Sequence, residues 1–281
     1  MPTAVIDGCT IHYQLSGEGA PVALTPGGRL GMDAIRSTSD LLATRYRVFQ
    51  WDRRNTGASD VWIGDPSEQL VWADDLAEML RRVDMAPAYL AGGSAGSRVA
   101  YLTALRHPDV VKGLVLWSVS GGPYSSQFLG YQYHTPFITE AMKGGMEAVI
   151  GTPFFRERID ANPSNRSRLL ALDPVEFVAV MHRWNRFFYY RDDTPVIGAT
   201  GAELRSLRCP ALVFEGNDDV HPPEAAEAVH RLIEGSEFVP SPWTTEDFVY
   251  RQVGRVAGSV VDLYPRLGPA IFDFIDRAEA T

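Results

Sequence analysis

Short apolar segments alternate with amphipathic helical segments along most of this chain, and this alternation constrains the fold more than any other feature. Apolar runs typical of buried strands are separated by stretches whose apolar residues recur at three- and four-residue spacing. The strands are expected at Cys9–Leu15, Pro21–Thr25, Tyr46–Trp51, Ala88–Ala91, Val111–Trp117 and Ala211–Glu215, and the helices at Met32–Ala43, Gln69–Val83, Pro223–Leu232 and Pro265–Ala278. This order predicts an α/β fold with βαβ crossovers and a mostly parallel sheet covered on both faces.

Residues 122–208 depart from this alternation. The segment is rich in aromatic residues and proline, its pattern is helical, and it contains no convincing buried strand. We therefore expect a core domain made of residues 1–121 and 209–281, with residues 122–208 inserted as a helical cap. Open α/β sheets bind ligands at the carboxyl ends of their strands, so the cap is expected to cover that edge.

The turn Gly92-Gly93-Ser94-Ala95-Gly96 stands between an apolar run and the helical pattern Ser97–Arg106. A G-x-S-x-G sequence that joins a strand to a helix is the pattern of a nucleophile elbow. Its glycines allow a sharp bend that holds the serine hydroxyl above the sheet. The free N–H groups of the following helix point to the same place. The pattern predicts Ser94 as a nucleophile.

Together with three other stretches, this turn resembles the α/β-hydrolase superfamily, near its capped esterases, lactonases, epoxide hydrolases and carbon–carbon hydrolases. Pro26–Arg29 is similar to the oxyanion loop of that family, and Asp52–Asp60 is similar to its D-x-R-G-x-G-x-S turn. Pro210–Pro222 is similar to the strand-end loop that carries the triad acid. The resemblance spans most of the chain outside residues 122–208. It implies a sheet of the eight-stranded α/β-hydrolase type with a helical cap.

The resemblance also implies roles for individual residues. Ser94 would be the nucleophile, and Asp219 would be the triad acid, with its neighbour Asp218 as the alternative. The backbone N–H groups of Gly28 and Ala95 would form the oxyanion hole. Donors fixed there stabilise the developing negative charge by about 3–4 kcal/mol.

The histidine that completes this family's triad is absent from its usual place. The family pattern places Gly-His at Gly258-Ser259 or, with another gap, at Pro242-Trp243, and no histidine occurs after His230. A serine hydroxyl is a poor nucleophile without a base, and removing the histidine of a serine triad costs about six orders of magnitude in rate. The chain is therefore expected either to recruit another base or to perform different chemistry.

Three histidines are candidates for that base. His134 and His182 lie in the predicted cap, which would roof the site. His221 follows Asp219 by two residues, where the family often carries His-Pro without catalytic use. The remaining histidines are expected to be structural or solvent-facing: His12, His107 and His230.

Aromatic residues in the predicted cap indicate an apolar pocket for a small hydrophobic or aromatic carbonyl substrate. The candidate pocket residues are Arg29, Tyr124, Trp184, Phe188 and Trp243. A substrate carboxylate could pair with Arg29, or with Arg183 or Arg186 of the cap. Asp52 and Arg53 are expected to brace their own turn.

Composition excludes several partners. The formal net charge of −9, from 26 basic and 35 acidic residues, argues against nucleic acid or an anionic membrane as the main partner. No signal peptide, membrane-spanning run, dinucleotide-binding glycine motif or metal-ligand spacing is visible. Cys9 and Cys209 are expected to be free thiols, which favours the cytoplasm. The sequence thus predicts no cofactor and no metal, in a monomer or homodimer.

Three functions remain open at this point. The first is hydrolysis of an ester or lactone by Ser94 with an atypical base, which would make the protein a serine hydrolase of the EC 3.1 type. The second is a lyase, decarboxylase, isomerase or cyclase in which Ser94 and the oxyanion hole polarise a carbonyl. The third is a ligand-binding protein that has lost catalysis, since function depends on the site and not on the fold.

Overall fold

A computed structural model describes residues 1–280, and within them one sheet has eight strands in the order β1-β2-β4-β3-β5-β6-β7-β8. The strands are β1 Thr3–Ile6, β2 Cys9–Ser16, β3 Pro21–Thr25, β4 Arg47–Trp51, β5 Ala88–Gly93, β6 Val111–Trp117, β7 Ala211–Phe214 and β8 Glu237–Val239. β2 pairs antiparallel with β1 and β4, and the other neighbouring pairs are parallel. The predicted mostly parallel α/β sheet is confirmed.

Helices cover both faces of the sheet because successive side chains of a strand point to opposite faces. On β5, Leu90 packs into the cluster that includes α2 (Glu68–Arg82), α3 (Ala95–Arg106) and α9 (Pro223–Leu232). Its neighbours Tyr89 and Ala91 pack into the opposite cluster, with α1 (Arg36–Leu42) and α11 (Gly268–Glu279). One strand therefore anchors two apolar layers.

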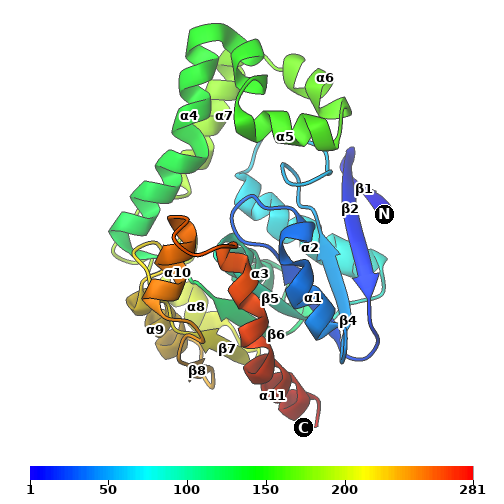
Figure 1. Cartoon of the computed structure of the whole chain (residues 1–281), viewed down its shortest axis with the longest axis vertical. Helices are drawn as coiled ribbons and strands as arrows, with labels where there is room; N and C mark the ends of the chain where they lie inside the picture. Colours follow the sequence, from blue (N-terminus) through cyan, green and yellow to red (C-terminus); the bar gives the residue numbers. More distant parts are fainter. Residues whose placement is uncertain (281) are drawn as a thin grey trace.

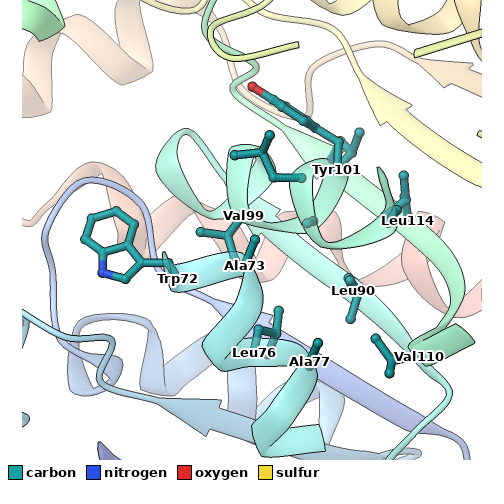
Figure 2. Packing of buried hydrophobic residues seen from close by; sticks show 14 of the residues in the cluster. Trp72, Ala73, Leu76, Ala77, Leu90, Val99, Tyr101, Val110 and Leu114 are labelled. Carbon is teal, nitrogen blue, oxygen red and sulfur yellow. The ribbon is translucent and has the colours of Figure 1, made fainter. Parts of the chain in front are cut away.

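The packing of α2 follows from its sequence pattern. Its apolar residues at three- and four-residue spacing form one stripe, which faces β5 and α3. Figure 2 shows Leu76 and Ala77 of this stripe on the side of α2 toward Leu90, and Ala73 beside Val99 of α3. Replacing a fully buried leucine such as Leu76 by alanine costs about 2–5 kcal/mol, so this contact fixes α2 firmly on the sheet.

Four helices of the predicted cap share a hydrophobic cluster of their own. They are α4 Gly122–Ile150, α5 Pro153–Ala161, α6 Ser164–Leu170 and α7 Pro174–Arg186. Figure 1 shows them grouped in green at one end of the molecule, beyond the sheet. The helix α8 (Gly201–Ser206) instead packs against α3 and α9, and Leu204 belongs to the cluster of the main sheet.

The C-terminal part differs most from the predicted elements. A helix α10 (Thr245–Gln252) that the sequence pattern does not predict follows β8. The helix expected at Pro265–Ala278 is divided into a 3-10 segment, η3 (Val260–Leu267), and α11. Shorter 3-10 turns also occur at Met32–Ile35 and Pro108–Val110. None of the helices in residues 1–280 combines the length and apolar character needed to span a membrane.

Candidate active site

The turn from β5 into α3 is built as the glycine pattern predicts. Ser94 has φ 54° and ψ −114°, a conformation that side-chain-bearing residues rarely adopt and that carries strain. A Cβ added to Gly92 would lie 2.4 Å from the carbonyl carbon of Gly96, and one added to Gly96 would lie 2.2 Å from the carbonyl oxygen of Thr25. Only glycine fits at either position, so Ser94 is held at a tight bend.

The loop after β7 lies at the same edge of the sheet. β7 pairs in parallel with β6, and β6 with β5, so the chain leaves β7 close to Ser94. The loop then folds back on itself, because a Cβ at Gly216 would lie 2.1 Å from the carbonyl oxygen of His221. A hydrogen bond of 3.1 Å from the His221 N–H to the Asp218 carbonyl oxygen closes this turn.

Ser94, His221 and Asp218 form one hydrogen-bonded chain. His221 Nε2 lies 3.0 Å from Ser94 Oγ, and His221 Nδ1 lies 2.8 Å from Asp218 Oδ2. The other carboxylate oxygen of Asp218 accepts the backbone N–H groups of Val220 at 2.9 Å and His221 at 3.0 Å. An imidazole thus stands between a serine hydroxyl and a carboxylate that the backbone holds in place.

Two opposing effects act on the pKa of Asp218. Burial would raise the pKa, but the hydrogen bond and charge of His221, with the two backbone N–H groups, outweigh burial and hold the pKa below its usual value. The carboxyl group is therefore ionised at neutral pH. An ionised carboxylate is the form that can accept a proton-bearing Nδ1 of histidine.

The structure brings Asp218, the alternative acid, and not Asp219 to the imidazole of His221. Asp219 is exposed, and within residues 1–280 the carboxylate bonded to His221 is that of Asp218. The reason is the geometry of the turn. The side chain of Asp218 accepts the N–H groups of Val220 and His221, and this directs its carboxylate toward His221. Asp219, one residue farther along, lies on the outside of that turn. The contact with His221 thus favours Asp218, the alternative acid, over Asp219.

Of the three candidate histidines, the structure brings His221 to Ser94. His134 is buried in the cap, where its Nδ1 lies 2.9 Å from the Gly130 carbonyl oxygen. Burial, aided by the positive charge of Arg29, lowers the pKa of His134 to about 3. His182 lies exposed on α7.

The segment that carries the histidine in similar proteins has another role here. Trp243 is buried in the cluster that includes α11, with its ring 5.7 Å from that of Tyr264. Its carbonyl oxygen accepts a hydrogen bond of 2.8 Å from Asn217 Nδ2 on the loop after β7. Trp243 therefore supports the loop of Asp218 and His221 from behind, which sequence reasoning missed.

The predicted oxyanion loop packs against the elbow. A Cβ on Gly27 would lie 3.1 Å from the Gly93 carbonyl oxygen and 3.4 Å from Ser94 Cβ, which shows how closely the two turns approach. Gly28 has a positive φ of 52°, which favours glycine. Ala95 is the first residue of α3, where the N–H has no acceptor within the helix. Both predicted donors thus lie on turns that meet at Ser94.

A small apolar cluster, called here the roof cluster, lies over this loop. It consists of Leu129, Tyr133, Phe188 and Ile197, and Val220 of the loop after β7 packs against it. The rings of Tyr133 and Phe188 meet edge to face at 5.6 Å, and the Tyr133 hydroxyl lies 3.8 Å from the place a Cβ of Gly28 would occupy. Phe188 therefore packs against the tyrosine whose hydroxyl lies over Gly28.

Of the other predicted pocket residues, Trp184 lies within the cap cluster and Tyr124 lies at a groove that includes Asp218. Trp184 stacks on Trp62 at 5.9 Å in the cap cluster, and its Nε1 donates to the Gly64 carbonyl oxygen at 2.7 Å. Tyr124 is 55% exposed and stacks on Phe128 at the start of α4. Tyr124 and Phe128 line an open groove of about 1100 Å³ whose other wall includes Asp218 and Asp219.

The arginines named as possible partners of a substrate carboxylate have other partners or lie at the surface. Arg29 is already paired with Glu68, and its Nη1 donates to the Tyr133 carbonyl oxygen at 2.9 Å. Arg183 pairs with acidic residues at the surface, and Arg186 is exposed. Arg53, expected to brace its turn, is fully buried with its guanidinium 4.4 Å from the centre of the Trp72 ring.

The turn that contains Arg53 is braced by its neighbours. The carboxylate of Asp52 accepts the N–H groups of Met32 at 2.7 Å and Ala58 at 2.8 Å, as the sequence leads us to expect. Arg54 donates two hydrogen bonds, of 2.7 and 2.9 Å, to the carboxylate of Asp75. Within residues 1–280, no group of three or more histidine, cysteine, aspartate or glutamate side chains is arranged to hold a metal ion.

Comparison with known proteins agrees with this fold. Residues 21–152 match the family model of the alpha/beta hydrolase fold. The chain has the α/β-hydrolase fold. The enol-lactonase from Burkholderia xenovorans has a similar structure, with a TM-score of 0.62 at 18% sequence identity over 98% of this chain and 100% of that one. This likeness concerns the fold.

Relatives in sequence are hydrolases by name. The chain is 30% identical over 110 residues to the uncharacterized hydrolase YraK of Bacillus subtilis. These residues make up 39% of this chain and 41% of that protein. It is 27% identical over 213 residues to the (E)-2-((N-methylformamido)methylene)succinate hydrolase of Acinetobacter baylyi, covering 75% and 76%. The chain thus matches less than half the length of the first relative.

Proposed function

We propose that this protein is a serine hydrolase of small esters or lactones, with Ser94 as nucleophile, His221 as base and Asp218 as acid. One observation carries the proposal: the imidazole of His221 lies 3.0 Å from Ser94 Oγ and 2.8 Å from the Asp218 carboxylate. The triad is atypical because the acid and the base come from one loop. Hydrolase relatives support the reaction class.

The first half-reaction follows from these contacts. Ser94 Oγ attacks the substrate carbonyl carbon while His221 Nε2 takes the hydroxyl proton. Asp218 accepts the Nδ1 proton in a hydrogen bond, which fixes the tautomer and stabilises the imidazolium that forms. The N–H groups of Gly28 and Ala95 receive the oxyanion. The proton on Nε2 then passes to the leaving alkoxide, and an acyl-serine remains.

The second half-reaction uses the same groups with water as nucleophile. His221 Nε2 removes a proton from the water, whose oxygen attacks the acyl carbon. Collapse of the tetrahedral intermediate breaks the bond to Ser94 Oγ, which regains its proton from His221. The products are a carboxylic acid and an alcohol, or a hydroxy acid when the substrate is a lactone.

The roof cluster supports a small, partly apolar acyl group. It packs against the loop of His221 through Val220 and stands above Gly28 through Tyr133. Apolar side chains with few polar groups are the usual lining of a small-molecule site. Of the relatives, the Acinetobacter protein is named for hydrolysis of a succinate derivative, a small carboxylic acid.

The two alternative functions depend on the absence of a base. That absence motivates both the lyase-like chemistry and the inactive binding protein. His221 supplies an imidazole at hydrogen-bond distance from Ser94, so hydrolysis needs no further group. Hydrolysis is therefore the function that the contacts favour.

The test is covalent labelling of Ser94 together with turnover of a chromogenic ester. A fluorophosphonate should label wild type once per chain, and peptide mass spectrometry should place the label on Ser94. p-Nitrophenyl butyrate should be hydrolysed by wild type and not by Ser94→Ala. The His230→Asn variant is a matched control for His221→Asn, because His230 lies on α9 with its ring against Ser236. Equal labelling of wild type and His221→Asn would contradict the proposal.

A further inference from the structure

Two arginines lie fully buried under the cap with unsatisfied donors. Arg53 donates from Nη2 to the Leu30 carbonyl oxygen at 3.2 Å, but its Nε and Nη1 have no hydrogen-bond partner within the described residues 1–280. Arg98 donates to Gln69 at 2.9 Å and to Ser120 at 2.8 Å, whereas its Nε also has no partner there. Buried polar groups, and charged ones above all, are normally hydrogen-bonded, so these donors need an acceptor.

The acidic groups nearby are already engaged. Glu68, whose charge acts on the pKa of Arg53, accepts from Arg29, Asn55 and Gln69. The carboxylate of Asp52 is held by backbone N–H groups. Burial lowers the pKa of Arg53 to about 10, so its guanidinium remains charged at neutral pH. The layer beneath the cap therefore holds positive charge with free donors.

These donors lie beside the proposed reaction centre. Arg98 is one helical turn from Ser94, whose carbonyl oxygen accepts the Arg98 N–H at 3.1 Å. The Arg98 guanidinium stands 5.0 Å from the centre of the Phe188 ring in the roof cluster. Tyr133 of the same cluster lies over Gly28 and close enough to act on the pKa of Arg53. Arg98 thus contacts both the elbow of Ser94 and the roof cluster, and Arg53 lies within electrostatic range of Tyr133 in that cluster.

We propose that Arg53 and Arg98 bind a carboxylate on the acyl part of the substrate, so that the preferred substrates are half-esters of short dicarboxylic acids or lactones that carry a carboxylate. This inference rests on the proposed function. A carboxylate offers two oxygens, which can accept from Arg53 Nη1 and Arg98 Nε, and hydrogen bonds between charged partners are the strong ones.

The open groove beside Asp218 has the opposite charge. Its acidic residues include Asp219 and Glu224, both exposed to solvent, where water and salt screen their fields. The buried arginines act in an environment with much less screening. The buried arginines predict a preference for anionic substrates, and the acidic groove predicts a preference for cationic ones. Substrates of different charge therefore distinguish the two regions.

The decisive experiment compares three p-nitrophenyl esters of matched length. They are the glutarate half-ester with a free carboxylate, its methyl ester, and the 4-(trimethylammonio)butyrate ester. Wild type should favour the free acid over the methyl ester about 10- to 100-fold in kcat/KM, the usual worth of a hydrogen bond to a charged group. A ratio near one, or a preference for the cationic ester, would overturn the inference.

Variants connect this preference to the arginines. In Arg53→Met the acid-to-methyl-ester ratio should fall toward one, and Arg53→Lys should retain part of it. The matched control is Arg231→Met, since Arg231 is exposed on α9 and should leave the ratio as in wild type. Where Arg53→Met fails to show cooperative unfolding, Arg98→Met provides the same comparison. An unchanged ratio in a folded Arg53 or Arg98 variant counts against the site.

A binding measurement separates this inference from the proposed function. Glutarate should raise the melting temperature of Ser94→Ala, and this rise should be lost when Arg53→Met is added. Labelling of Ser94 without any charge preference would reject the carboxylate site and leave the hydrolase standing. Stabilisation by glutarate without labelling or turnover would reject the hydrolase and leave the carboxylate site standing.

Discussion

Asp218 and His221 lie three residues apart on the loop after β7, with 2.8 Å between the carboxylate Oδ2 and the imidazole Nδ1. Their pairing therefore depends on a local turn and not on two distant loops meeting. The turn is fixed by Gly216, by the N–H groups that Asp218 accepts, and by Asn217, which is tied to the Trp243 carbonyl oxygen. The chain thus places an acid and a base together without a histidine in its last segment.

Asp218→Asn and Asp219→Asn form a matched pair of adjacent substitutions. Asp218→Asn should lower kcat about 10³- to 10⁴-fold, because the amide can no longer stabilise the imidazolium or fix the histidine tautomer. Asp219→Asn should stay within a few-fold of wild type, since Asp219 is exposed and outside the turn. Steady-state hydrolysis of a p-nitrophenyl ester measures both. A larger loss in Asp219→Asn would restore the assignment first predicted from sequence.

His221→Asn should lower kcat by about six orders of magnitude, as expected when the base of a serine triad is lost. His134→Asn tests the second candidate, whose ring is buried among cap aromatics and bonded to a backbone carbonyl. This variant should be less stable than wild type but should keep the base that activates Ser94. Fluorophosphonate should therefore label folded His134→Asn at the wild-type rate. Normal labelling of His221→Asn would show that another group activates Ser94.

Gly96→Ala should strongly destabilise the protein. The added methyl group would lie 2.2 Å from the Thr25 carbonyl oxygen, so the elbow and the end of β3 would have to move apart. Gly201→Ala is the control, because the nearest atom to its new Cβ lies 3.7 Å away at the start of α8. Urea unfolding should show a loss of several kcal/mol, roughly the upper range for point mutations, in Gly96→Ala and little change in Gly201→Ala. Equal stability of the two would contradict the tight elbow.

Stability should also depend on Asp218 at acid pH. The pKa of this carboxyl is lower in the folded protein than its ordinary value of 3.8, so the unfolded chain binds the proton more readily. Its contribution is therefore fully present above pH 3.8 and is lost as the pH falls through the lower folded pKa. Unfolding free energies of wild type and Asp218→Asn, measured from about pH 7 to about pH 3, should converge toward the acid end. A constant difference over this range would show that the carboxyl has an ordinary pKa.

The parts of the site that sequence predicts well are those fixed by backbone sterics. The glycines around Ser94 are required by contacts under 3 Å, and such requirements leave a readable pattern in the chain. The sheet follows for a similar reason, because buried parallel strands need continuous apolar runs. Gly28 and Ala95 are backbone donors whose positions depend on these same turns.

The acid and base are harder to predict because they depend on side-chain directions within one turn. Asp218 and Asp219 are identical in chemistry, and only the fold of residues 216–221 decides which one reaches the imidazole. One signal is present in the sequence: His221 is the histidine that directly follows a core strand at the carboxyl edge. The burial of Arg53 has no local signal, since it depends on Trp72 and the cap.

The His221 imidazole and the Asp218 carboxylate are attached to one short loop, so a movement of that loop would move both groups together. A shift of residues 216–222 would carry imidazole and carboxylate in step, leaving their mutual bond intact while changing the aim of Nε2 toward Ser94. The Ser94 hydroxyl would then lose its base although the hydrogen bond between Asp218 and His221 stays intact. Under the proposed mechanism, reactivity would depend on the position of this one loop, which Asn217 ties to the carbonyl oxygen of Trp243.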